Sequence, residues 1–73
     1  MKIEKVLMRI KKLRLAKGYT LENMAFELDI SASTYRKVEM NETKLTLERL
    51  IKISKVLSVE LDEILDTTKN STT

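Results

Sequence analysis

The chain has 73 residues, which is enough for one small domain and too few for a second. It contains no cysteine and no histidine. The sequence therefore excludes a disulfide framework, a thiolate or imidazole metal site and the commonest nucleophile–base pairs of covalent catalysis. We expect a protein that is not an enzyme and that uses no metal and no other cofactor.

Positive charge is concentrated near the start of the chain. Residues 1–19 hold seven cations and one carboxylate, a net charge of +6, whereas residues 58–66 hold four carboxylates and no cation. A chain polarised in this way can present a basic face to a polyanion and keep its acidic end away from it. Two ordinary solvated helix faces would give the same counts, so charge alone leaves both interpretations open.

The chain shows no sign of a membrane or secretory segment. No hydrophobic stretch approaches the roughly 20 residues that a membrane span needs, and no signal-peptide pattern opens the sequence. A basic amphipathic first helix could in principle lie on a membrane surface, but its apolar face lacks aromatic anchors and is needed for the core. We therefore expect a cytoplasmic protein with no membrane partner.

Proline is absent and Gly18 is the only glycine, so the apolar residues at helical spacing predict an all-α fold with five helices. The first helix covers residues 3–17, and Gly18 ends it as a left-handed cap. Thr20 caps a second helix over residues 21–28.

A turn at Asp29, which tolerates left-handed geometry, leads to a third helix over residues 32–40 that Ser31 caps. A loop follows, and Asn41 is suited to a left-handed conformation there. The remaining predicted elements are a fourth helix over residues 47–57 capped by Thr46, a fifth helix over residues 60–66, and a polar, disordered tail at residues 67–73. Residues 1–66 would form the domain.

The second and third helices have the pattern of a helix-turn-helix. Ala25 is the small residue at the point where the two helices must nearly touch. The apolar residues of this stretch face the partner helix or the core: Met24, Ala25, Leu28, Ile30, Tyr35 and Val38. A helix-turn-helix of this kind holds its second helix out for insertion into a DNA major groove.

The third helix has one side suited to reading DNA bases. Tyr35 and Val38 point inward, and residues three and four apart share one side of a helix, so four residues are expected on the opposite face. These residues are Ala32, Ser33, Arg36 and Lys37. Their types suit base edges: Arg or Lys for guanine acceptors, Ser for donors or acceptors, and Ala for the thymine methyl. The alternative is a solvated polar face.

Contacts with DNA phosphates are expected on either side of this helix. Helix N-termini present free N–H groups and a positive dipole end, so the starts of the second and fourth helices are natural anion sites. The candidate residues are Lys17, Thr20, Asn41, Thr43, Lys44 and Thr46. Such contacts position a protein without reading sequence. For Lys17 and Lys44, surface solubility is the alternative.

In order and spacing, several segments resemble the Cro and phage-repressor type of helix-turn-helix regulator, the Xre family. The segments are residues 10–14, 17–20, 24–25, 30–39, 47–53, 57–59 and 61–65. The resemblance implies a five-helix, lambda-repressor-like domain that binds operator DNA, usually as a dimer, in a transcriptional regulator. It also implies a structural ion pair between Arg14 and Glu39 that does not read DNA.

The expected partner is a double-stranded DNA operator, bound by a homodimer because a monomer of this size contacts one half-site. We expect the dimer surface on the fifth helix and the end of the fourth. A partly exposed Leu61 or Ile64 would support this surface, and the favoured alternative is that both residues belong to the core of the monomer. The alternative function is an antitoxin or anti-regulator on the same fold that acts mainly by binding a partner protein. Salt separates the two, because DNA binding weakens steeply as salt rises.

Overall fold

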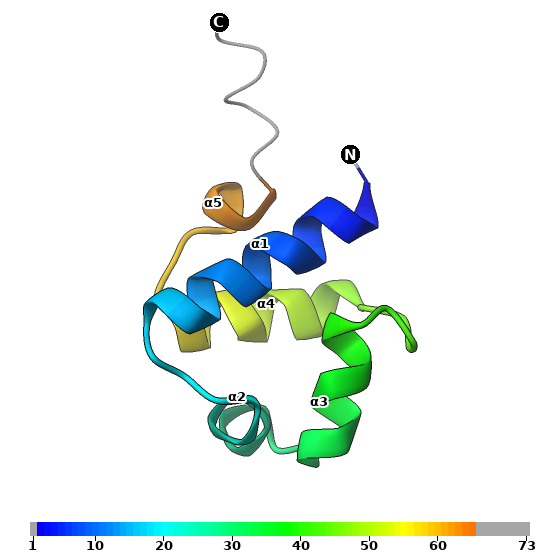
Figure 1. Ribbon diagram of the computed structural model, residues 1–73. Coiled ribbons are helices and arrows are strands. Elements are labelled where there is room, and N and C mark those ends of the chain that lie inside the picture. The colour runs from blue at the N-terminus through cyan, green and yellow to red at the C-terminus, as the bar shows by residue number, and fades with distance from the viewer. Residues whose placement is uncertain (1, 66–73) are drawn as a thin grey trace, which may run out of the picture.

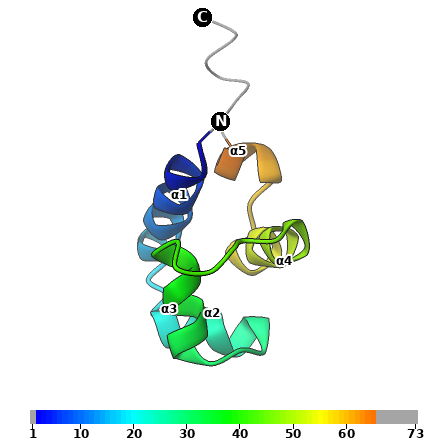
Figure 2. The ribbon, with the colours of Figure 1, turned by 90° about the vertical axis from the view of Figure 1, so that its right-hand side faces the viewer.

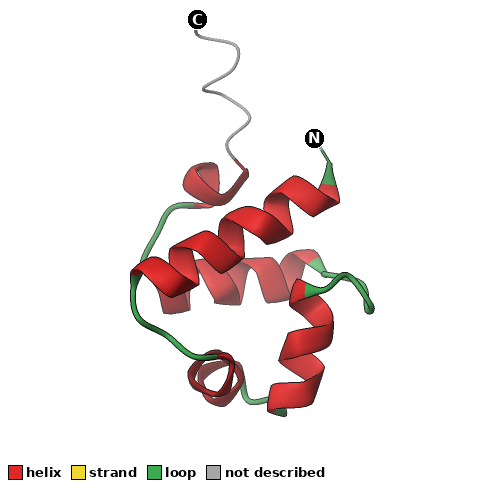
Figure 3. Cartoon of the chain, in the orientation of Figure 1, coloured by secondary structure: helices red, strands yellow, loops and turns green. Residues whose placement is uncertain are grey.

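The computed structural model describes residues 2–65, and in this range every regular element is a helix (Figures 1 and 3). The five helices are α1 (Ile3–Ala16), α2 (Leu21–Leu28), α3 (Ala32–Glu39), α4 (Leu47–Leu57) and α5 (Leu61–Leu65). The all-α, five-helix prediction is confirmed. None of these helices is long and apolar enough to cross a bilayer. The predicted tail at residues 67–73 lies outside the described residues.

Three of the helices are shorter than the sequence predicts. Lys17 and Met40 are C-caps and not the last helical residues, because Gly18 and Asn41 follow them with φ of 75° and 60°. Such left-handed residues cannot continue a helix. At the start of α5, the Glu60 N–H donates to the Glu63 carboxylate at 3.1 Å, so this residue precedes the helix.

Hydroxyl side chains begin three of the helices, as the sequence predicts. Thr20, Ser31 and Thr46 each accept a hydrogen bond from the backbone N–H three residues later. The donors are the amides of Asn23 at 3.0 Å, Thr34 at 3.1 Å and Arg49 at 3.1 Å. Each bond satisfies an N–H that would otherwise lack a partner at the helix start. The three helix starts are thus determined by local chemistry.

Asp29 makes the turn between α2 and α3. Its φ of 59° and ψ of 43° are left-handed, and the next residue, Ile30, donates its N–H to the Ala25 carbonyl at 3.0 Å. This bond closes the C-terminus of α2 and reverses the chain at once. The two helices of the motif are therefore joined by a short and rigid connection.

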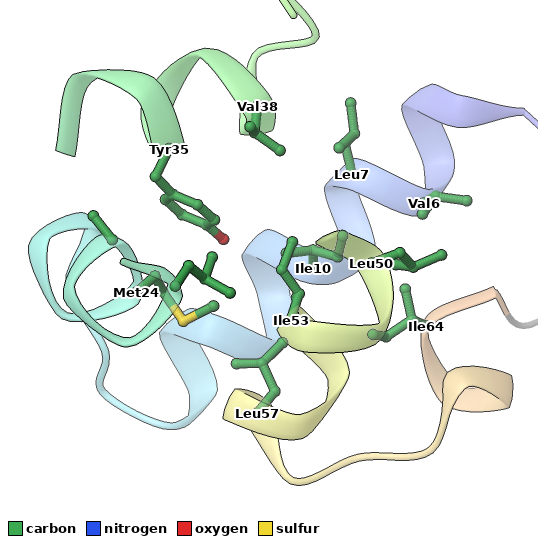
Figure 4. Packing of buried hydrophobic residues seen from close by; sticks show 12 residues of the cluster. Val6, Leu7, Ile10, Met24, Tyr35, Val38, Leu50, Ile53, Leu57 and Ile64 are labelled. Atoms are coloured by element: carbon green, nitrogen blue, oxygen red, sulfur yellow. The ribbon is translucent and has the colours of Figure 1, made fainter. Parts of the chain in front are cut away.

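The core draws on all five helices. Figure 4 shows side chains from α1, α2, α3, α4 and α5 converging on one cluster. Its members are Val6, Leu7, Ile10, Met24, Ala25, Leu28, Tyr35, Val38, Leu50, Ile53, Leu57 and Ile64. Because Tyr35 and Val38 are fully buried in it, the inner side of α3 is anchored to the rest of the domain.

The other three helices lie on two opposite sides of the pair formed by α1 and α4. In Figures 1 and 2, α2 and α3 lie on one side of this pair and α5 lies on the other. Figure 2 shows α3, and the loop that leads from it to α4, facing the viewer. The second helix of the motif thus stands at the edge of the molecule.

A substitution at Ala25 tests whether α2 packs against α3 at this residue. Its side chain is 2% exposed, so Ala25→Leu forces a much larger side chain into a filled space. We expect the free energy of unfolding to fall by about 1–3 kcal/mol, as overpacking typically costs. Urea denaturation measures the change, and Ala16→Leu on the exposed end of α1 is the control. A midpoint equal to that of the wild type would mean that the two helices do not meet at Ala25.

Candidate nucleic-acid interface

The outer face of α3 carries two exposed cations. Ser33, Arg36 and Lys37 are exposed, whereas Tyr35 and Val38 on the inner side are buried. Neither Arg36 nor Lys37 forms a hydrogen bond or ion pair through its side chain with any residue in the range 2–65. The two positive charges are therefore available to a ligand.

Ala32 belongs only partly to this exposed face, so the prediction that it lies on the outer side of α3 with Ser33, Arg36 and Lys37 needs correction. The side chain is half-buried and packs against the core. Residues three apart are neighbours on a helix, so Ala32 lies beside the buried Tyr35, at the border between the inner and outer sides of α3. The face available to a ligand is centred on Ser33, Arg36 and Lys37.

The six candidate phosphate-binding residues are all exposed, and they fall into two groups. Asn41, Thr43 and Lys44 lie in the loop between α3 and α4, and Thr46 begins α4. Thr20 begins α2, and Lys17 lines an open depression at the α1–α2 connection together with Lys55, which lies near the opposite end of α4. Since α4 has 11 residues, about 16 Å in length, the structure does not bring Lys17 to the loop.

Thr20 and Thr46 mark the starts of α2 and α4. Their hydroxyl oxygens accept amide hydrogen bonds within the helix, so each hydroxyl hydrogen remains available as a donor. Neighbouring N–H groups of the first helical turn point the same way. Both helix starts can therefore donate hydrogen bonds to an anion.

A buried ion pair ties the end of α3 to the end of α1. Arg14 donates from Nε to Glu39 Oε2 at 2.8 Å and from Nη2 to Oε1 at 3.2 Å. Its Nη1 donates to the Tyr19 carbonyl at 2.9 Å. The side chains of Arg14 and Glu39 are only 7% and 6% exposed. Such a bidentate contact restricts the orientation of α3 relative to α1.

Tyr35 extends this pair into a network, a role that its apolar spacing in the sequence does not predict. The phenol O–H donates to Glu39 Oε2 at 2.6 Å. The available signals were the spacing of four residues between Tyr35 and Glu39 on one helix and the need of a buried tyrosine for a partner. Burial and, secondly, the hydrogen bond to the Glu39 carboxylate raise the pKa of Tyr35.

The raised pKa of Tyr35 predicts a loss of stability at high pH. The protonated Tyr35 phenol contributes fully to the free energy of unfolding below about pH 10, where an unfolded tyrosine is also protonated. This contribution declines as the pH rises from there towards the pKa of Tyr35 in the folded protein. The wild type should therefore lose stability above about pH 10 more steeply than Tyr35→Phe, which has no phenol to ionise at this position. Urea denaturation across this range measures both slopes, and parallel curves would contradict the prediction.

Comparison with known proteins agrees with this geometry. The helix-turn-helix family model matches residues 10–64, so the chain belongs to the helix-turn-helix family. This is a family of transcription regulators and not of enzymes. The resemblance to Xre-type regulators is confirmed by the same match and by the relatives that follow.

Two curated relatives are phage-derived regulators. The chain is 39% identical over 57 residues to the SPbeta prophage-derived uncharacterized HTH-type transcriptional regulator YonR of Bacillus subtilis, covering 78% of this chain and 53% of that one. It is 37% identical over 60 residues to the cryptic phage CTXphi transcriptional repressor RstR of Vibrio cholerae, covering 82% and 54%. The chain thus spans about half the length of these relatives.

A solved structure supports the fold. The crystal structure of the clp gene regulator ClgR from C. glutamicum superposes with a TM-score of 0.81, covering 100% of this chain and 96% of that one. The sequences are 19% identical, so the likeness shows the fold alone.

Proposed function

We propose that the protein binds double-stranded operator DNA sequence-specifically, with α3 in the major groove, and acts as a small transcriptional regulator. The observation that carries this proposal is the contrast between the two sides of α3. The inner side is held by Tyr35, Val38 and the Arg14–Glu39 pair. The outer side presents Arg36 and Lys37, which have no side-chain partner within residues 2–65. The names of the relatives YonR and RstR agree with the proposal.

In this proposal, Arg36 and Lys37 donate to the O6 and N7 acceptors of guanine, which are the commonest partners of these side chains. Ser33 bonds to a donor or an acceptor on a base edge. Ala32, at the border of the face, retains room for a contact with a thymine methyl through its exposed part. A rigidly held α3 presents these groups in one orientation, which base recognition needs.

The two groups of phosphate-binding residues would fix the register of α3 in the groove. The α3–α4 loop and the start of α4 would bind the backbone on one side through Asn41, Thr43, Lys44 and Thr46. Thr20 at the start of α2, with Lys17 nearby, would bind it on the other. These interactions supply affinity that does not depend on sequence.

We also propose that two copies bind together. One α3 reads one half-site, and helix-turn-helix proteins generally pair two half-sites about 34–36 Å apart. A homodimer on DNA would therefore recognise a palindromic operator. Both relatives come from bacteria, whose DNA lies in the cytoplasm, so the protein would act there.

Selection from randomised duplex DNA, followed by binding measurements on the enriched sequence, tests the function. We expect an enriched palindrome, and a Kd that rises about 10³- to 10⁵-fold between 50 and 200 mM salt if a dimer binds six to ten phosphates. No enrichment, with DNA affinity that salt does not change, would contradict the proposal and favour a module that binds a partner protein.

A further inference from the structure

Exposed apolar side chains gather at the start of α4. Leu47 is 68% exposed and Ile51, one turn later, is 36% exposed. Beside them lies a groove of about 310 Å³ between α1, α4 and α5, lined mainly by Ile3, Val6, Leu45, Leu50 and Leu65. An apolar side chain that entered this groove would displace water from it.

The position of this apolar patch differs from the expected dimer surface. Ile64 is 1% exposed and belongs to the core, and Leu61 is half-buried against it. Ile64 therefore serves the core, the use that the sequence favours for it, and Leu61 keeps part of its side chain exposed on α5. Leu47 and Ile51, by contrast, are exposed beside an apolar groove at the first turns of α4, at the opposite end of this 11-residue helix from Leu57.

We propose that this patch, made of Leu47, Ile51 and the neighbouring groove, is the surface on which a second copy of the chain docks when two half-sites are bound. The inference rests on the proposed function, because that function requires two copies. Three properties of the patch identify the occupant as a second copy: its shape, its lack of charge and its place beside the α3–α4 loop.

The shape of the patch suits contact with itself. A two-fold interface brings the same surface of both copies together, so the surface must supply both a protrusion and a hollow. Leu47 and Ile51 form an exposed ridge, and the groove lies next to this ridge on the same side of α4. The ridge of each copy can enter the groove of the other.

The lack of charged side chains at the patch removes an electrostatic obstacle to self-association. The chain carries a net charge of +3, so two copies repel one another overall. Within the described residues the groove is lined by aliphatic side chains and Thr46, and no charged side chain lines it. Contact at this patch therefore avoids placing like charges directly opposite one another.

The patch also continues into the candidate DNA interface. Leu45 and Thr46 line the groove, and the same two residues end the loop that follows α3. Two copies in contact here bring their α3–α4 loops next to each other. Both α3 helices then lie near the junction, where adjacent half-sites on one duplex can be reached.

The test uses the full chain with two matched double variants. Leu47→Gln/Ile51→Gln makes the ridge polar without changing the charge, and Met8→Gln/Leu15→Gln does the same to two exposed residues of α1. Sedimentation velocity measures self-association in solution and on DNA. Fluorescence anisotropy measures binding to duplexes that carry one or two copies of the selected half-site.

We expect the α4 variant to bind a single half-site like the wild type and to bind the two-site duplex at least about tenfold more weakly, which corresponds to about 1.4 kcal/mol. The α1 variant should match the wild type on both duplexes. A wild type that stays monomeric in solution and on DNA would overturn the proposal, as would an α4 variant that assembles normally.

Failure of the proposed function has a different signature. If the wild type binds neither duplex, DNA recognition is refuted, and self-association in solution still decides whether the patch pairs two copies. If binding to one half-site persists and only the α1 variant loses assembly, the function stands and the docking surface is on α1.

Discussion

Arg14→Met is expected to lower the free energy of unfolding by about 3–5 kcal/mol, the usual cost of removing one partner from a buried ion pair. The substitution leaves the Glu39 carboxylate buried with only the Tyr35 hydroxyl as a side-chain donor among the described residues, and it also removes the donor to the Tyr19 carbonyl. A domain of this size has roughly 4–11 kcal/mol of stability, so much of the total is at risk. Urea denaturation measures the loss.

Two further variants show whether the loss comes from the buried charge. Lys52→Met removes an exposed pair with Glu48 at 3.9 Å, which should cost about 1 kcal/mol or less. Arg14→Met/Glu39→Gln removes both buried charges and should recover part of the stability, because no uncompensated charge remains. If Arg14→Met and Lys52→Met shift the midpoint equally, the network does not hold α3 against α1.

Arg36→Ala and Lys37→Ala are each expected to weaken binding to the selected operator by roughly 1–3 kcal/mol, the usual value of a side chain that reads one base. Both side chains are exposed and have no partner within residues 2–65, so the stability of the fold should stay close to that of the wild type. Discrimination between bases should also relax at the operator positions that each residue reads. Anisotropy titrations on the operator and on its single-base variants measure both effects.

Lys11→Ala and Lys12→Ala provide the control, because they remove the same charge from two adjacent, exposed positions of α1. Their effect should be equal on operator and unrelated DNA, as expected for charge alone. Unchanged operator affinity in both α3 variants would remove Arg36 and Lys37 from the reading face. Operator affinity that falls equally in the α1 and α3 variants would mean that α3 contributes charge and no base recognition.

Local residue chemistry made most of the fold predictable. Thr20, Ser31 and Thr46 have side chains that accept a backbone N–H three residues later, and Asp29 tolerates the left-handed turn that follows α2. These are interactions over a few residues, so the sequence by itself determined where α2, α3 and α4 begin and where the motif turns. The helical spacing of apolar residues determined which side of each helix enters the core.

Only the tertiary structure decided which side chains of each helix are covered by a neighbouring helix. Ala32 is half-buried because it adjoins Tyr35 at the core, and Leu47 is exposed because no other described helix covers its side of α4. The ion pair between Arg14 and Glu39 joins residues 25 apart in the sequence, so it forms only when α1 packs against α3. Periodicity indicates that a side chain faces inward or outward, but the burial of each residue depends on which distant helix packs there.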